Sequence, residues 1–331
     1  MNSFGRIFRV HIFGESHGEC VGITIDGCPA GLALSVGDFT ADIERRKPGA
    51  KGTTPRKEDD LPIIKSGLFN GKTTGAPITI LFENKNTRSA DYEKLRAVPR
   101  PGHADFTASK KFGGYEDYRG SGHFSGRLTV CLVAAGVIAK KLLHTIEINS
   151  AIIEIGGEKD LEKGLQKAID AKDSVGGIVE CTVKNLPAGL GEPFFDSAES
   201  LLSHAVFAIP AVRGIEFGTG FAAAKMFGSQ HNDALKDVTG STFTNHAGGI
   251  VGGITNNNEL VFRIAIKPTS STPIEQKTLN IETGEIENFS VKGRHDLCIA
   301  LRVPVILEAV TAFVLADLML IEQKIPRVIS T

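Results

Sequence analysis

Two long segments of the chain, residues 128–143 and 297–320, are apolar on almost every side. Both exceed ordinary strand length, so each is predicted to form a helix that is buried on most of its circumference. The second segment carries Arg302, Glu308 and Asp317, and charges within such a run argue against a membrane-spanning helix. Other elements must therefore cover both helices inside the protein.

Several further segments alternate between apolar and polar residues. Such alternation is typical of antiparallel strands that are covered on one face only. Their apolar positions are Val21, Ile23 and Ile25; Ile78, Ile80 and Phe82; Val179, Cys181 and Val183; and Leu260, Phe262, Ile264 and Ile266. When the helices lie between two sheets, the apolar face of each sheet covers the helices, and the helices cover both apolar faces. We therefore predict an α+β fold, a β-α-β sandwich with long buried helices between two mainly antiparallel sheets.

The remaining pattern favours a single domain over residues 1–331. No low-complexity linker or internal repeat divides the chain, although its length would allow two domains. Amphipathic helices are predicted at 38–47, 160–171 and 198–207, and glycine-rich loops at 51–54, 113–122 and 248–253.

Composition excludes several classes of protein. The 37 Lys and Arg residues nearly balance 38 Asp and Glu residues, whereas proteins that bind nucleic acid without sequence preference need a positive excess. The five cysteines form no CxxC pair, which predicts reduced thiols. The N-terminal segment lacks the apolar block of a signal peptide, so a cytoplasmic protein is predicted. The histidines show no HExxH or HxH spacing, so no metal is expected. Neither a nucleic acid nor a membrane is expected as a partner.

Polar residues gather where the two buried helices begin. Ser125 and Arg127 precede the first helix, with Ser125 placed as its N-cap. Arg294, His295 and Asp296 precede the second helix, with Asp296 as a candidate cap. Ordinary capping explains each cap residue alone, but free N–H groups beside an arginine favour anion sites.

Two histidines lie in tight turns. His17 lies in the glycine-bounded turn 14–18, and His103 lies in the Pro-Gly turn 100–105, which also presents Arg100. A lone histidine in a turn is usually structural, although its near-neutral pKa suits proton transfer.

Three further segments are consistent with a bound ligand. Residues 45–51 end a helix with several cations, which could equally offset the helix dipole in solvent. Residues 267–271 close a strand with one lysine and three hydroxyl groups, which could cradle a phosphate or the edge of a cofactor. Segment 248–253 lacks the acidic residue and βαβ context of a dinucleotide fingerprint, so close packing against a flat ligand is the better interpretation. The residues alone thus predict a site for a small, multiply anionic substrate and for proton transfer.

At these same residues the chain closely resembles the chorismate synthase family. The first family signature resembles residues 14–18 and 21–29, the second resembles 125–127 with the helix that follows, and the third resembles 294–296 through 308–310. Further matches at 100–105, 173–177, 246–253 and 267–271 extend the resemblance over essentially the whole chain.

The resemblance implies an enzyme of the shikimate pathway that converts 5-enolpyruvylshikimate 3-phosphate to chorismate by 1,4-anti elimination of phosphate. It also implies a requirement for reduced FMN (FMNH2), although the reaction has no net redox change. The subunits would be β-α-β sandwiches that form a homotetramer.

The resemblance further implies roles for individual residues. His17 would protonate the departing phosphate, His103 would support the charge state of the reduced flavin, and Asp296, near flavin N5, would help to remove the substrate proton. Ser16 and Ser125 would orient or relay protons for these groups. The phosphate and the two carboxylates of the substrate would be held by Arg46, Lys51, Arg100, Arg127 and Arg294. FMN would be lined by His123, Phe124, Ser125, Ala211, Gly252, Lys267, Pro268, Thr269, Ser270, Ser271 and Arg294.

Three departures from the common family pattern are found, two at single residues and one at a pair. Lys51 stands where many members have Arg, and Pro210 precedes Ala211 where Asn is common. His123 and Phe124 replace an Arg-Ser or Arg-Ala pair. These departures bear on FMN affinity more than on the reaction.

Two alternative functions make different predictions for the sequence. A flavin- or anion-binding module that has lost catalysis would show damage at His17, His103 or Asp296, and all three are present. A family member that also reduces its own flavin with NADPH is the second alternative. The compact chain shows no large insertion, which favours the type that does not reduce its flavin.

Overall fold

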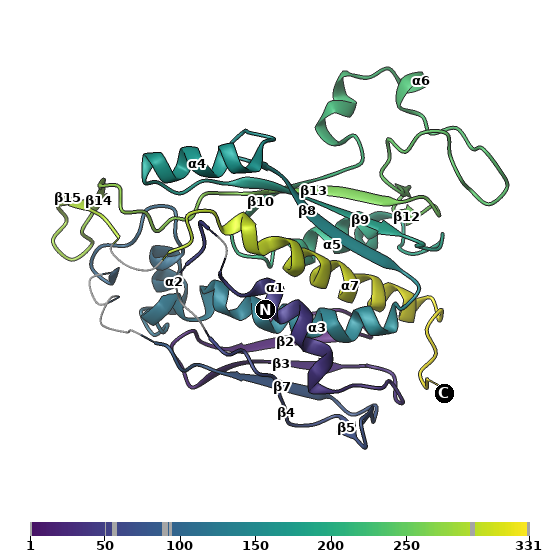
Figure 1. The fold of residues 1–331 in the computed structure, drawn as a ribbon, viewed down its shortest axis with the longest axis horizontal. Coiled ribbons are helices and arrows are strands. Elements are labelled where there is room, and N and C mark those ends of the chain that lie inside the picture. Colours follow the sequence, from purple (N-terminus) through teal and green to yellow (C-terminus); the bar gives the residue numbers. More distant parts are fainter. Residues whose placement is uncertain are drawn as a thin grey trace.

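A computed structural model describes residues 2–49, 51–54, 58–87, 92, 95–291 and 295–329 of the chain. Two antiparallel sheets enclose a layer of long helices (Figure 1). The α+β β-α-β sandwich predicted from the apolar patterns is confirmed.

Each sheet is built around two of the alternating segments of the sequence, which are flanked by strands that the pattern did not predict. The first sheet has the order β1 (Ser3–Phe4), β2 (Arg9–Gly14), β3 (Cys20–Asp26), β7 (Ile78–Glu83) and β4 (Ile63–Ile64). The second has the order β10 (Val212–Phe217), β13 (Leu260–Ile266), β9 (Gly177–Lys184) and β8 (Glu147–Ile155). The register places Ile23 opposite Ile80 in the first sheet and Cys181 opposite Phe262 in the second. All four side chains are fully buried, so one face of each sheet covers the helix layer.

The helix layer consists of α3 (Thr129–Leu142) and α7 (Val303–Ile321). α3 packs on β3 and β7, whereas α7 packs on β8 and β9. The two helices meet at Gly136, where a Cβ atom would lie only 2.2 Å from Cβ of Ala309. By length and composition both could cross a membrane, but most of each is buried inside this protein, so they are core helices.

The charged residues of α7 are paired inside the core. Glu308 receives two hydrogen bonds from Arg45, at 2.6 and 2.7 Å, and one from Lys140 at 2.9 Å. Asp317 accepts hydrogen bonds from the backbone N–H groups of residues 6, 7 and 8 at 2.7 to 2.8 Å. These bonds compensate the cost of burying a carboxylate. They also tie the N-terminal segment and the segments that carry Arg45 and Lys140 to α7.

The other predicted helices are confirmed as α1 (Thr40–Arg46), α4 (Leu161–Ala171) and α5 (Ala198–Val206). α1 packs against α3 and α7, α5 packs against α7, and α4 packs on β8. Among the described residues, the pattern did not predict the helices α2 (Asp105–Phe112) and α6 (Gly228–His231) or the 3-10 turns η3 (Arg119–Phe124), η4 (Gly126–Leu128), η5 (Phe194–Asp196) and η6 (Gly220–Lys225). Two further 3-10 turns, η1 (Val36–Phe39) and η7 (Ile299–Arg302), overlap the starts of predicted helices. The residues that the structure describes also form three small hairpins: β5 (Leu68–Phe69) with β6 (Lys72–Thr73), β11 (Ile250–Val251) with β12 (Ile254–Thr255), and β14 (Gln276–Leu279) with β15 (Ile286–Phe289).

Two local predictions are wrong in part. The predicted loop 113–122 runs into η3, and the predicted loop 248–253 contains β11. Gly248 and Gly249 have positive φ angles, and a Cβ atom on either would lie within 2.7 Å of the chain's own backbone. Close contact with the chain's own backbone therefore explains why glycine is needed at 248 and 249. The prediction that these glycines pack against a flat ligand is not upheld.

Candidate functional site

Two cavities adjoin where α3 and α7 begin. The first, of about 230 Å³, is lined by the turns that open both helices, and the second, of about 560 Å³, lies against the first sheet and the end of β13. Residues that line both cavities are Ser121, Ser125, Gly126, Thr129, Pro210, Thr269 and Ile299. A shared wall means that ligands in the two cavities would contact each other or the same side chains.

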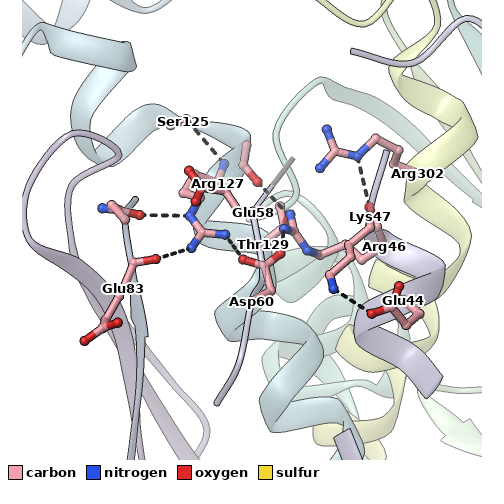
Figure 2. A network of polar contacts seen from close by, with 12 residues as sticks. Glu44, Arg46, Lys47, Glu58, Asp60, Glu83, Ser125, Arg127, Thr129 and Arg302 are labelled. Atoms are coloured by element: carbon pink, nitrogen blue, oxygen red, sulfur yellow. Dashed lines mark hydrogen bonds and ion pairs between the residues drawn. The ribbon is translucent and has the colours of Figure 1, made fainter. Parts of the chain in front are cut away.

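A buried cluster of three charges forms one side of the first cavity (Figure 2). Arg46, at the end of α1, donates from Nη2 to Oδ2 of Asp60 at 2.6 Å, and Nη1 of Arg127 donates to the other oxygen, Oδ1. Burial lowers the pKa of Arg46 to about 10, with Asp60 opposing that shift. Burial would raise the pKa of Asp60, but the two guanidinium charges outweigh it and lower that pKa. Arg46 and Asp60 are therefore both charged at neutral pH.

Arg127 is placed by the predicted helix cap. The Ser125 side chain accepts a hydrogen bond from the Arg127 N–H at 3.3 Å as N-cap of η4, which confirms its predicted capping role. The Arg127 side chain then crosses to the first sheet, where Nε donates to Oδ1 of Asn84 at 2.9 Å and Nη2 donates to the Glu83 carbonyl at 3.1 Å. The guanidinium group is thus held by three partners while lining the cavity.

His17 reaches the first cavity from the turn between β2 and β3. Its ring contacts Tyr92 edge to face, with the ring centroids 5.3 Å apart. Gly120 lies directly against the ring, and a Cβ atom there would be 2.3 Å from Cδ2 of His17. Ser16 is fully buried beside it, and its N–H donates to the Gly122 carbonyl at 3.1 Å. The turn and the glycine-rich η3 segment therefore fix the imidazole together.

Arg100 joins the two cavities through a second charged cluster. Its guanidinium group pairs with both oxygens of Asp105 at 2.7 Å and donates to Oγ of Ser121 at 2.8 Å. Nδ1 of His103 lies 2.7 Å from Oδ1 of Asp105. Nδ1 also lies 3.0 Å from Nη2 of Arg100, so it stands between a carboxylate that can only accept a hydrogen bond and a guanidinium group that can only donate one. Arg100 lines the first cavity and His103 lines the second.

Asp296 lines the first cavity but does not cap the second helix. The prediction that Asp296 caps this helix is wrong. The Leu297 N–H donates to the Gly52 carbonyl at 2.9 Å, and η7 begins only after Cys298. The Asp296 carboxylate instead accepts from the Thr54 N–H at 2.8 Å and from Nη1 of Arg302 at 3.1 Å. Nε of Arg302 also donates to the Arg46 carbonyl at 3.1 Å, as seen in Figure 2.

The second cavity combines apolar surface with a few polar groups. Nζ of Lys267 donates to Oγ of Ser270 at 2.6 Å and to the Gly102 carbonyl at 2.7 Å. Burial, with a smaller effect of Arg213, lowers the pKa of Lys267. Oγ1 of Thr269 is buried and has no hydrogen-bond partner in the described part of the chain. A ligand in this cavity could supply that partner.

The predicted cofactor residues mostly line this second cavity. They are His103, His123, Phe124, Ser125, Ala211, Lys267, Pro268, Thr269, Ser270 and Ser271. His123 also ties the loop to the N-terminal segment, with Nδ1 2.9 Å from the Gly14 carbonyl and Nε2 3.1 Å from Oδ1 of Asn2. A residue that departs from the common family pattern therefore supports the cavity wall.

Two predicted residues, Lys51 and Gly252, are not brought into either cavity. Nζ of the exposed Lys51 donates to Oε1 of Gln166 at 2.9 Å, and Gly252 lies at the tip of the β11–β12 hairpin. Arg294 lies outside the described residues. Ser16 adjoins the site through His17 rather than lining it.

Sequence reasoning missed Asp60, Arg302, Ser121 and Tyr92 as members of the first cavity. Arg302 carried a usable signal, because an arginine within an otherwise apolar helix needs a partner. Asp60 carried no such signal, because it follows Glu58 and Asp59 and the three residues together are typical of an acidic run exposed to solvent.

Comparisons with known proteins agree with one another. A family model described as chorismate synthase matches residues 8–320. The chain is 71% identical to a chorismate synthase of Chitinophaga pinensis over 329 residues, which is 99% of both chains. It is 46% identical to one of Dehalococcoides mccartyi over 360 residues, again covering 99% of each. A crystal structure titled as chorismate synthase shares the fold, with a TM-score of 0.73 at 24% identity, over 96% of this chain and 93% of that one.

Proposed function

The chain belongs to the chorismate synthase family, and on this premise we propose that it converts 5-enolpyruvylshikimate 3-phosphate to chorismate by 1,4-anti elimination of phosphate. Membership of the family makes the protein a lyase. The charge of the first cavity is the observation that supports this substrate most strongly. Its lining guanidinium groups are those of Arg46, Arg100, Arg127 and Arg302.

These cations match the charges of the substrate, which carries one phosphate and two carboxylates. Guanidinium groups bind both kinds of anion through paired N–H donors. Arg46 and Arg127 are nearly buried and would hold an anion strongly, because a cavity that excludes water screens charge poorly. Lys51 is directed to Gln166, so it contributes less than the arginines.

Two groups of the first cavity would move the protons of the reaction. His17 would donate a proton to the phosphate as the C–O bond breaks, which makes the phosphate a better leaving group. Asp296 would accept the proton that the substrate loses. The Thr54 N–H and Arg302 hold its carboxylate in one orientation. Ser16 and Ser125 would orient these groups from beside the imidazole and from the shared wall.

The chemistry of its walls supports the larger, second cavity as the site of reduced FMN. Lys267, Ser270 and the buried hydroxyl of Thr269 would hold polar groups of the flavin, whereas Phe124 and Leu132 offer apolar surface to its rings. When bound, reduced FMN supplies an electron-rich ring beside the substrate without a net change of redox state. His103 would exchange protons through Nε2, because Asp105 engages Nδ1.

We further propose a cytoplasmic homotetramer. Exposed aromatic side chains support association, because a monomer rarely leaves so many uncovered. They include Phe194, Phe195, Phe221, Phe227 and Phe243, each at least 71% exposed. Light scattering should give four times the chain mass of 35.3 kDa.

Anaerobic product formation tests the proposed function. Purified protein with 5-enolpyruvylshikimate 3-phosphate and chemically reduced FMN should form chorismate and release one phosphate per chorismate. Oxidised FMN with NADPH alone should give no chorismate, because the compact chain favours the type that does not reduce its flavin. No chorismate under the first condition would reject the proposed function, and full activity under the second would reject only the statement about NADPH.

A further inference from the structure

Asp60 occupies an unusual place for a carboxylate, in the wall of a cavity that is proposed to bind an anion. Its side chain is 1% exposed, and those of Arg46 and Arg127 are each 3% exposed. Its two oxygens accept from different arginines, one from each side (Figure 2). Its backbone has a φ of +52°, a left-handed conformation that aspartate tolerates better than most residues. The carboxylate is thus directed between two guanidinium groups that belong to different elements, α1 and η4.

The other contacts of the two arginines are weaker anchors. Arg46 has one further side-chain hydrogen bond, from Nη1 to Oγ1 of Thr129 at 3.2 Å, and its Nε is buried without a hydrogen-bond partner among the described residues. Arg127 is otherwise held by neutral acceptors, the Asn84 amide and the Glu83 carbonyl. Without Asp60, two buried like charges would face each other and would separate.

We propose that Asp60 is a positioning residue, which sets the spacing and the orientation of Arg46 and Arg127 for the anionic groups of the substrate. This inference rests on the proposed function. Asp60 acts through the two arginines, and one carboxylate against two guanidinium groups leaves the cluster with a net positive charge. A preformed pair of donors spares the substrate the cost of ordering them when it binds.

A simple counter-ion would behave in the opposite way. A carboxylate that only competed with the substrate for the arginines would weaken binding, so its removal would tighten binding. A carboxylate that positions the arginines must weaken binding when it is removed. The sign of the change in substrate affinity therefore separates the two roles.

Asp60→Asn and Asp60→Glu provide the test. The amide of Asn keeps one acceptor but turns an NH2 group toward the second arginine, so the Kd for 5-enolpyruvylshikimate 3-phosphate, titrated by calorimetry without FMN, should rise by about tenfold to a hundredfold. The Glu variant keeps the charge but displaces it by one methylene, so its Kd should lie between those of the wild type and the Asn variant. At saturating substrate with reduced FMN, kcat should change by less than about threefold in both, because the reacting groups are intact.

Glu308→Gln is the matched control. Glu308 is also a buried carboxylate paired with an arginine, but it lines neither cavity, so this variant should lose stability with an unchanged Kd. Wild-type turnover in the same assay reports on the proposed function separately, since the calorimetric Kd needs no reaction. An unchanged or lower Kd in Asp60→Asn would overturn the proposal, as would a Kd change equal to that of Glu308→Gln. Failure of both Asp60 variants to fold would also overturn it, because the residue would then serve stability alone.

Discussion

At the scale of residues, the site depends on groups that are held from two sides. His17 lies between Tyr92 and the bare backbone of Gly120, and Asp296 is bound by a backbone N–H and by Arg302. Such fixed groups lose little entropy when a substrate binds, so they suit proton transfer at one position.

His17→Ala should slow turnover by about 100-fold to 10,000-fold, the usual contribution of a positioned general acid. The melting temperature should stay close to that of the wild type, because the turn is also held by the Ser16 N–H bond to Gly122. Single-turnover rates and thermal melts measure both quantities. A folded variant with the full rate would remove His17 from the mechanism.

Asp296→Asn separates a catalytic role from a structural one. The amide oxygen can still accept from the Thr54 N–H, so the variant should melt near the wild-type temperature. Turnover should fall by about 100-fold or more, because an amide cannot accept the substrate proton. If rate and stability are both unchanged, Asp296 only ties the loop to Arg302.

Asp105 should make stability depend on pH. Burial raises its pKa, but hydrogen bonds and charge from Arg100 and His103 outweigh this and hold the pKa well below its usual range. An aspartate with a lowered folded pKa stabilises the protein above its unfolded pKa of about 4 and loses that contribution as the pH falls further. The difference in unfolding free energy between wild type and Asp105→Asn should therefore be full at pH 6 and shrink below about pH 4. A difference that stays constant from pH 6 to pH 3 would contradict this account.

The sequence identified only residues with a distinctive local pattern. His17 stands in a glycine-bounded turn and Arg127 follows a capping serine, and both line the first cavity. Asp60 was missed because its partners lie 14 and 67 positions away. Asp296 looked like a cap, but a backbone contact with Gly52 delays the start of the helix.

At the scale of elements, the close contact of α3 with α7 holds the two helix starts at one cavity. The contact depends on Gly136, where the backbones approach too closely for a side chain. The apolar pattern predicted both helices well, because a helix buried on all sides needs apolar residues all round. α2 was missed because the segment has few apolar positions and because its first residue, Asp105, pairs with Arg100 instead of marking the start of a helix.

Gly136→Ala should destabilise the protein by about 1 to 3 kcal/mol, the usual cost of overpacking a core. The added Cβ would overlap Ala309, and neither helix can move without disturbing a sheet. Gly37→Ala is the control, since a Cβ there meets only Oγ of Ser35 at 3.6 Å. Urea denaturation of both variants measures the difference. Equal stability of the two variants would mean that the helices adjust freely.

At the scale of the whole molecule, the layers bring together loops from distant parts of the chain. The order of layers followed from the sequence, because one-sided strands and all-round apolar helices have few ways to cover each other. The shared wall between the cavities did not, since it combines residues near 121–129, 210, 269 and 299. No local pattern specifies that meeting.

On the proposed function, the two adjoining cavities act as one site for substrate and reduced FMN. Titration of FMN into the protein, followed by flavin fluorescence with and without 5-enolpyruvylshikimate 3-phosphate, tests this claim most directly. The substrate should strengthen FMN binding markedly, because it would cover the flavin across the shared wall and neutralise the arginines beside it. Equal FMN affinity in both titrations would contradict the claim.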